Sequence, residues 1–228
     1  HTSFAMATGD VRYYLNGLLL ELNQNQLTAV ATDGHRLALM TTSFEFHAAE
    51  PIRVIIPRKA VIELMRLLEH SDNAVTLAFS PTHIKVTISP QLTLISQLIE
   101  GQFPDYHTVL PKDPDKQVIA QTQMLKTTLA QSAILSNEKF RGVRLILLPN
   151  TLQVCSRNPL QEEAEIECAV DYTGEQFEIG FNVNYLLDVL NNISTQEVQL
   201  SLSDSYSSCL LQPKDINNIQ YVIMPMRL

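Results

Sequence analysis

The sequence predicts an α+β protein built from two similar domains of antiparallel strands and helices. Short runs of β-branched and aliphatic residues are separated by turn signals such as Asp33-Gly34, as in antiparallel meanders. A strand followed by a helix occurs at 52–65 and again at 178–190, which indicates an internal repeat. The Pro- and charge-rich stretch 110–116 between the copies is typical of a linker.

In the first half, hydrophobic periodicity and turn residues predict a meander, a strand–helix unit and three further strands. The helix begins after Pro57, where the missing N–H costs nothing. The expected strands are Val11–Leu22, Leu27–Thr32, His35–Thr42, Ile52–Ile56, Ala74–Phe79, His83–Ser89 and Leu92–Ile99, and the helix is Arg58–Glu69.

The second half repeats this order, with one additional strand and helix at its start. Asn182 is the expected N-cap of its last helix. The expected helices run from Thr122 to Leu135 and from Asn182 through Asn192, and the strands lie near Val118 and at Val143–Leu148, Leu152–Ser156, Glu165–Tyr172, Phe177–Phe181, Val198–Ser203, Ser208–Gln212 and Tyr221–Met224.

We therefore expect two domains, residues 1–110 and 111–228. The first copy has no counterpart of the strand and most of the helix that open the second. Because the chain also begins with His1 instead of Met, we expect a fragment whose first domain is truncated at its N-terminus.

Composition limits the class of protein. With 228 residues, 45% of them hydrophobic, the chain can bury a substantial core. It has no run of about 20 apolar residues and no signal-peptide pattern, so we expect a soluble protein that does not enter a membrane. Cys155, Cys168 and Cys209 are odd in number and lack metal-site spacing, which favours a reducing cytoplasm. The net charge of −8 argues against nucleic-acid binding over the whole surface but leaves a local basic face possible.

No motif predicts a metal, a cofactor or a catalytic residue. The six histidines lack metal-ligand spacing, and neither a GxGxxG motif nor a P-loop is present. Asp33, His35 and Arg36 place an acid, an imidazole and a guanidinium side by side, so an enzyme remains one alternative. Strand alternation predicts Asp33 and His35 on one side and Arg36 on the other, which favours a structural role.

Two segments of the sequence are candidates for a binding surface. The apolar chain end predicts that Val222 and Ile223 belong to the core, while Pro225 ends the strand and leaves Met224–Leu228 to form part of a surface. On the first complete helix, Lys59, Glu63, Arg66 and His70 form a polar stripe opposite Val61, Leu64, Met65 and Leu68. This stripe is either a solvated face or, with the neighbouring Arg12, Tyr13 and Tyr14, a nucleic-acid contact.

Several segments together resemble the bacterial sliding-clamp family, the beta subunits of DNA polymerase III. The resemblance covers essentially the whole chain in order and spacing. The segments are 11–17 (VRYYLNG), 31–38 (ATDGHRLA), 57–59 (PRK), 103–106 (FPDY), 136–144 (SNEKFRGVR), 180–183 (GFNV) and 224–228 (MPMRL).

The resemblance implies the DNA-clamp fold, with antiparallel sheets outside and helices facing the hole of a ring. It implies a non-catalytic, cofactor-free processivity factor whose homodimer encircles duplex DNA topologically and without sequence specificity. DNA polymerase, clamp loader and repair proteins would bind through short linear peptides. The alternative is a clamp-derived partner-binding module that does not encircle DNA.

The resemblance also implies roles for individual residues. DNA contacts would be Arg12, Tyr13, Tyr14, Arg58, Lys59 and Arg66, and the ring interface would involve Ile134, Leu135, Glu162 and Glu163. The peptide-binding groove would be lined by Leu15, Thr32, Gly34, His35, Arg36, Leu37, Pro104, Thr108, Val109, Phe140, Asn182, Tyr185, Tyr206, Ser208, Val222, Met224, Pro225, Met226 and Arg227. Thr108, Tyr206 and Gly9 depart from the family pattern, where a basic, a small aliphatic and a polar residue are familiar.

Overall fold

The computed structural model describes residues 1–23, 25–43, 50–69 and 74–227, so His70 of the expected polar stripe lies outside the described part. The chain divides into two compact units, unit 1 (His1–Pro104) and unit 2 (Asp105–Leu228). This division falls six residues before the boundary expected at 110. One reason is that the Ser208 hydroxyl donates to the Val109 carbonyl at 3.1 Å, which ties the segment before the linker to unit 2.

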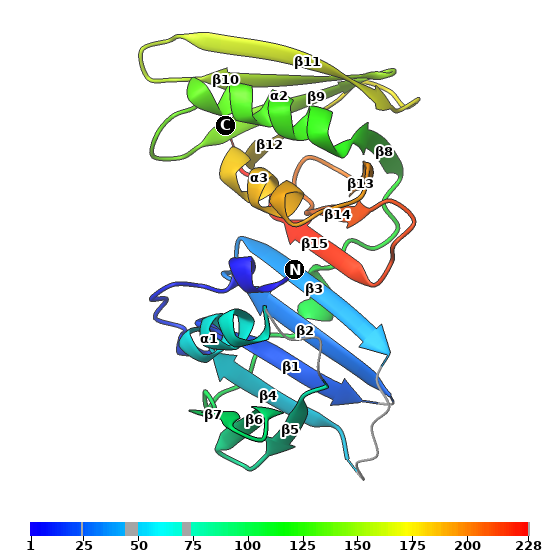
Figure 1. Ribbon diagram of the computed structural model, residues 1–228. Helices are drawn as coiled ribbons and strands as arrows, with labels where there is room; N and C mark the ends of the chain where they lie inside the picture. The colour runs from blue at the N-terminus through cyan, green and yellow to red at the C-terminus, as the bar shows by residue number, and fades with distance from the viewer. Residues whose placement is uncertain (24, 44–49, 70–73, 228) are drawn as a thin grey trace. The chain divides into compact units, whose positions relative to one another are not determined.

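Unit 1 contains one antiparallel sheet in the order β3-β2-β1-β4, a smaller sheet in the order β5-β6-β7, and the helix α1, which lies against β1 and β4 (Figure 1). Its elements are η1 (Ser3–Ala5), η2 (Tyr13–Leu15), β1 (Gly17–Asn23), β2 (Gln26–Thr32), β3 (Arg36–Ser43), β4 (Ile52–Pro57), α1 (Arg58–Leu68), β5 (Thr76–Phe79), β6 (His83–Ser89) and β7 (Leu92–Gln97).

The first strand is shorter than the sequence predicts. A strand is expected over Val11–Leu22, but Tyr13–Leu15 form a 3₁₀ turn and β1 begins only at Gly17. The Leu15 N–H donates to the Arg12 carbonyl at 2.8 Å and so closes that turn. Aromatic and aliphatic residues have a high strand propensity, and the local hydrogen bond overrides it here.

The outward face of α1 also differs from the prediction. Val61 is 6% exposed, as expected for a core residue, but Met65 is 53% exposed and Ile62 is 50% exposed. The helical periodicity of the sequence predicts Met65 on the apolar face of α1, opposite its polar stripe. In the described part of unit 1 no second α-helix lies against α1, so its apolar arc is wider than the surface that covers it.

Unit 2 contains one antiparallel sheet in the order β12-β9-β10-β11-β8-β13-β14-β15 and two helices that pack on each other. Figure 1 shows α2 crossing β10 and β11, with α3 beside it. The elements are η3 (Tyr106–Val109), β8 (Lys116–Gln121), α2 (Thr122–Ile134), β9 (Gly142–Leu148), β10 (Thr151–Arg157), β11 (Glu163–Asp171), β12 (Phe177–Asn182), α3 (Val183–Asn191), β13 (Glu197–Leu202), β14 (Cys209–Pro213) and β15 (Ile219–Ile223).

The core of unit 2 follows the period-two and helical patterns of the sequence. Along β9, Val143, Leu145 and Leu147 are buried and alternate with more exposed residues. Leu186 and Leu190 of α3 are each 1% exposed and face this interior. The described residues contain no helix that is long and apolar enough to cross a membrane.

The internal repeat is visible in the strand order. Four neighbouring strands of unit 1 have the order β4-β1-β2-β3. The corresponding strands of unit 2 have the order β12-β9-β10-β11, so each strand has the equivalent neighbours in both units. In each case the outermost of these strands leads directly into a helix, α1 or α3. The predicted α+β fold with repeated strand–helix units is confirmed.

Candidate functional site

The residues implicated in peptide binding divide between the two units. In unit 1, residues 34–37 lie in or just after the turn that joins β2 to β3. In unit 2 the candidates lie in η3, at the start of α3, in the loop before β9, in the loop before β14, and at the chain end from Val222 of β15 onward.

The β2–β3 turn of unit 1 is organised by Asp33. Its Oδ1 accepts hydrogen bonds from the backbone N–H groups of His35 at 2.9 Å and Arg36 at 3.1 Å. Gly34 has a φ of +88°, a left-handed conformation that favours glycine, and its N–H donates to Thr32 Oγ1 at 3.0 Å. The Thr32 hydroxyl donates in turn to the Arg36 carbonyl at 2.6 Å. These bonds hold the turn in one conformation before any ligand arrives.

Arg36 lies on the same side as Asp33, contrary to the prediction from strand alternation. Its Nε donates to Asp33 Oδ2 at 3.1 Å. Alternation begins only with β3 at Arg36, whereas Asp33 belongs to the turn. The Arg36 Nη2 also donates to the Phe4 carbonyl at 3.2 Å, and its side chain is 13% exposed. The Asp33 carboxylate accepts hydrogen bonds from three N–H groups of residues 35 and 36, which is a structural role.

Arg12, a candidate DNA contact, adjoins this turn. Its guanidinium pairs with Asp10 at 2.8 Å and its Nη2 reaches the Asp33 carbonyl at 3.4 Å. The hydrogen bonds from Arg12 hold the pKa of Asp10 at about 2, well below the usual range of a carboxyl group. A Cβ at Gly34 would come within 3.0 Å of the Arg12 guanidinium. Arg12 therefore supports the turn, and its partner Asp10 was not among the predicted site residues.

The basic side chains among the other candidate DNA contacts of unit 1 differ in their exposure and in whether they already have a partner. Lys59 is exposed on α1, while Arg66 is exposed but pairs with Glu63 at 2.6 Å. Arg58 is half-buried, and its Nη1 donates to the Met6 carbonyl at 3.0 Å.

The two tyrosines form an aromatic pair. Tyr13 is 57% exposed, and its ring meets that of Tyr14 edge-on with the centroids 5.8 Å apart. An exposed ring of this kind can stack on a nucleobase or lie along a backbone.

In unit 2 the chain leaves the core after β15 and stays on the surface. Ile223 is fully buried, whereas Met224 is 38% exposed. The Met226 N–H donates to the Gly180 carbonyl at 2.9 Å, which holds the tail along β12. The Arg227 guanidinium carbon lies 5.7 Å from the centre of the Tyr206 ring, within the range of a cation–π contact.

The loop that carries Tyr206 is held by Asp204. Its Oδ1 accepts from the N–H groups of Tyr206 at 2.7 Å and Ser207 at 2.8 Å, and its Oδ2 accepts from the Ser207 hydroxyl at 2.8 Å. These hydrogen bonds lower the pKa of Asp204. Asp204 was not predicted as a site residue, although an Asp ahead of Ser and Tyr in a loop is a recognised turn signal.

A cavity of about 500 Å³ opens between this loop, the tail and the neighbouring strands of unit 2. Within it, Arg144 Nη1 lies 3.0 Å from Glu178 Oε1. The lining residues are Arg144, Glu178, Ile179, Gly180, Ser205, Tyr206, Met226 and Arg227. The first five were not predicted as site residues. Four of them lie on β9 and β12, whose register places Gly180 opposite Arg144, and Ser205 lies in the loop before β14.

Further candidates of unit 2 lie at capped or exposed positions. Asn182 is the N-cap of α3, as predicted, and its Oδ1 accepts from the Asn184 N–H at 2.9 Å. Phe140 is 56% exposed, and its backbone N–H donates to Asn137 Oδ1 at 3.1 Å. The hydroxyl of Thr108 donates to the Asp105 carbonyl at 2.7 Å, so it is engaged within its own turn.

The candidates for a ring interface lie at the C-terminal end of α2, in the turn after β10 and at the first residue of β11. Ile134 is 78% exposed, and Leu135 is half-buried. Leu160 is 80% exposed and was not predicted. Glu163 lies 3.3 Å from Arg157, so this acidic flank is partly neutralised.

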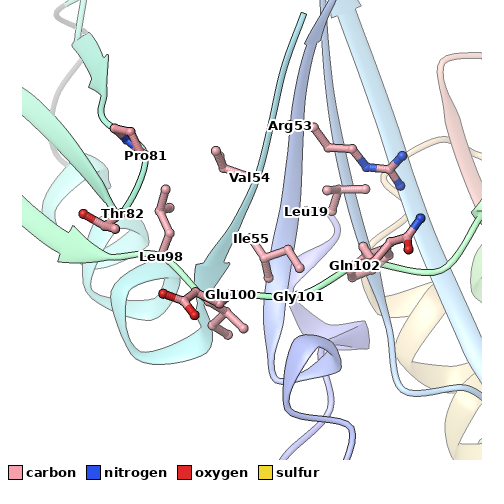
Figure 2. A pocket seen from close by; sticks show the side chains of 12 residues that line it. Leu19, Arg53, Val54, Ile55, Pro81, Thr82, Leu98, Glu100, Gly101 and Gln102 are labelled. Atoms are coloured by element: carbon pink, nitrogen blue, oxygen red, sulfur yellow. The ribbon is translucent and has the colours of Figure 1, made fainter.

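A second hollow, of about 400 Å³, lies in unit 1 among β1, β4, the β5–β6 turn and the segment that follows β7 (Figure 2). The Ile99 N–H donates to the Ile55 carbonyl at 2.9 Å and fixes that segment against β4. Arg53, at the rim, pairs with Glu21 at 3.2 Å. None of the predicted site residues lines it, and no group of three His, Cys, Asp or Glu side chains in the described part of the chain is arranged to hold a metal ion.

Two units with the same strand–helix module, followed by a surface tail after β15, have the architecture of a clamp-type protein. Comparison with known proteins identifies the family. Residues 1–105 match the family model of the DNA polymerase III beta subunit, central domain. Residues 107–227 match the family model of the DNA polymerase III beta subunit, C-terminal domain. The chain belongs to the family of DNA polymerase III beta subunits, as the sequence motifs predict.

Similar proteins and solved structures support the same family assignment. The chain is 52% identical over 227 residues to the beta sliding clamp of Pseudomonas putida and 47% identical over 231 residues to that of Escherichia coli. A crystal structure of the Pseudomonas aeruginosa sliding clamp matches with a TM-score of 0.97 at 50% identity, covering 100% of this chain and 62% of that one. The chain spans 62% of the length of the curated relatives.

Proposed function

We propose that this chain forms part of a processivity clamp that encircles duplex DNA as a ring and tethers the replicative polymerase and other proteins through a peptide-binding groove. The role is non-catalytic and cytoplasmic. Family membership over both units supports it. The observation that carries the groove is the tail after β15, which keeps its apolar residues on the surface and is fixed there by the Met226–Gly180 hydrogen bond.

The weak basic character of α1 fits a sliding function. A topological link needs only weak, non-specific attraction to phosphates, because tight contacts would stop sliding. Lys59 is free to approach a phosphate, whereas Arg12 and Arg66 already pair with Asp10 and Glu63. A chain of net charge −8 with a few partly neutralised basic groups is consistent with this balance.

For the homodimeric ring we propose an interface built on the exposed apolar side chains Ile134 and Leu160, with Leu135 beside them and Glu162 and Glu163 as an acidic flank. Exposing two large aliphatic side chains costs about 1.5 to 3 kcal/mol each relative to burial, which favours their coverage by a partner surface.

The ligand of the groove would be a short extended segment of a polymerase, a clamp loader or a repair protein. A peptide with Gln at one end and a Leu-Phe pair at the other could gain about 2 kcal/mol for each buried apolar side chain and about 1 kcal/mol for each hydrogen bond. After the cost of ordering the peptide, micromolar affinity, about −8 kcal/mol, is the expected upper end.

Fluorescence polarisation with such a peptide tests the groove. A variant that lacks Met224–Leu228 should bind at least tenfold more weakly than the intact chain, while its melting temperature changes little because those residues follow the last strand. Ile95→Ser, which alters an exposed aliphatic residue of β7 outside both the candidate groove and the proposed ring interface, is the control and should retain full affinity. Equal affinity of the truncated and intact chains would contradict the groove.

The alternative is a clamp-derived partner-binding module that does not encircle DNA. One observation favours it: three of the four basic candidate DNA contacts, Arg12, Arg58 and Arg66, are already engaged by Asp10, a backbone carbonyl and Glu63. The measurement of salt-dependent DNA binding described in the Discussion separates the two functions.

A further inference from the structure

We propose that the cavity beside Tyr206 and Arg227 is a carboxylate-binding subsite, which takes the side chain of a Glu or Asp next to the docking segment of a partner peptide. This inference rests on the proposed function. It adds a specificity determinant to the groove, since it assigns a ligand chemistry to a part of unit 2 that also includes Arg144 and Ser205.

The charges of the cavity favour an anionic group. Arg144 and Arg227 contribute two positive charges, and Glu178 contributes one negative charge that is paired with Arg144 at 3.0 Å. Among the ion pairs of the described residues, none involves Arg227. Within the described part of the chain, one guanidinium of the cavity therefore has no ion-pair partner, on a chain whose net charge is −8.

The position of Arg227 suits a carboxylate. Its guanidinium lies 5.7 Å from the centre of the Tyr206 ring, so the ring supports one side of the group. A ring contact of this kind engages the face of a guanidinium and leaves the N–H donors in its plane. Those donors form a fork that matches the two oxygens of a carboxylate.

Both walls of the subsite are held in place before a ligand arrives. Asp204 fixes the loop through three hydrogen bonds, one of them to the Tyr206 N–H at 2.7 Å. On the other side, the Met226 N–H donates to the Gly180 carbonyl at 2.9 Å, one residue before Arg227. Preorganisation of the ring and the tail lowers the entropic cost of ordering a long arginine side chain on binding. A small aliphatic side chain at position 206 would remove the ring and leave Arg227 less ordered.

Fluorescence polarisation with matched peptides tests the subsite on the intact chain. All peptides carry the Gln and Leu-Phe residues and a C-terminal amide, and they differ only by Glu or Gln at one flanking position, placed in turn before the Gln and after the Leu-Phe pair. At one of the two positions Glu should improve affinity about threefold to fivefold over Gln, as expected for a partly exposed ion pair. The preference should shrink as salt is raised.

Three variants assign the effect. Arg227→Gln should reduce the Glu-to-Gln preference to about one, and Tyr206→Val should reduce it in the same direction. Tyr206→Phe keeps the ring and should keep the preference. Arg157→Gln removes one positive charge from the same unit, at a residue that does not line this cavity, and serves as the control that leaves the preference unchanged.

The outcomes separate the subsite from the groove. If the Gln peptides bind and Glu gives no advantage at either position, or if the advantage survives in Arg227→Gln, the subsite is overturned and the groove stands. One further Gln peptide is made with a free C-terminal carboxylate in place of the amide; if that carboxylate gives the gain and a Glu side chain does not, the assignment to an acidic side chain is overturned. If none of the peptides binds, both the proposed groove and its subsite fail.

Discussion

The two strand–helix modules of this chain place nearly the same sequence pattern in different surroundings. Counting from the N-caps Pro57 and Asn182, Met65 of α1 and Leu190 of α3 occupy equivalent positions. Met65 is 53% exposed, whereas Leu190 is 1% exposed. The difference arises from neighbours, because α2 packs against α3 and no second α-helix packs on α1 within the described part of unit 1.

The modules also differ in charge. α1 carries Arg58, Lys59 and Arg66, while the sequence of α3, VNYLLDVLN, contains no basic residue. One copy of the module therefore offers a solvent-exposed helix with positive charge, and the other supplies a helix to the core. Repetition of a module sets where a helix lies on its own sheet, and the residues added around it decide what the helix does.

The largest difference between the modules should appear in stability. We expect Leu190→Ala to lower the free energy of unfolding by about 3 kcal/mol, because it removes a fully buried side chain and leaves a cavity. Met65→Ala should change it by less than about 1 kcal/mol, because the side chain is already half in water. Urea unfolding of both variants, with the slope compared to confirm that the denatured state is unaltered, measures this. Equal losses would show that α1 is as deeply packed as α3.

The second difference concerns DNA. We expect weak duplex binding whose log affinity falls with log salt with a slope of about −3 at most, since three basic side chains contribute roughly 0.9 each. Replacing Arg58, Lys59 and Arg66 by Gln should flatten the slope. Glu63→Gln releases Arg66 from its ion pair and should steepen the slope by at most about 0.9.

A matched control removes the same charge elsewhere in the chain. Gln substitutions at Arg53, Lys85 and Lys112, none of which lies on α1, should leave the slope close to that of the parent chain. Titrations by fluorescence anisotropy between 50 and 200 mM salt, with two unrelated duplexes, are the measurement. Salt-independent binding, or a preference for one duplex sequence, would favour a module that does not slide on DNA.

The smallest of the expected effects concerns the helix caps. α3 has a side-chain cap, the bond from the Asn184 N–H to Asn182 Oδ1 at 2.9 Å, whereas α1 begins after Pro57 with no side-chain cap bond. Asn182→Ala should destabilise unit 2 by about 1 kcal/mol. Asn182→Asp keeps an acceptor at the same place and should restore most of the loss. If thermal unfolding shows no difference between the Ala and Asp variants, the cap contributes nothing measurable.

Local sequence signals were sufficient for much of the fold. The strand–helix repeats, the Asp33-Gly34 turn, the Asn182 cap and the end of the last strand before Pro225 were all predicted, since each depends on a few adjacent residues. The family was recognisable from motifs for the same reason. The roles of single site residues stay predictions, because they concern partners and not the chain's own geometry.

Contacts between distant segments decided the remainder. Residues 13–15 have a high strand propensity but form a 3₁₀ turn that is closed by one hydrogen bond. The Arg36 side chain contacts Asp33, because β3 begins one residue later than the sequence pattern predicts. The approach of Arg227 to Tyr206 depends on the β9–β12 register and on the loop held by Asp204. By itself, the sequence determined which segments become strands, helices and turns, because propensity and periodicity act over a few residues. Only the tertiary structure decided which apolar and charged faces stay in water, because exposure depends on what packs against them from elsewhere in the chain.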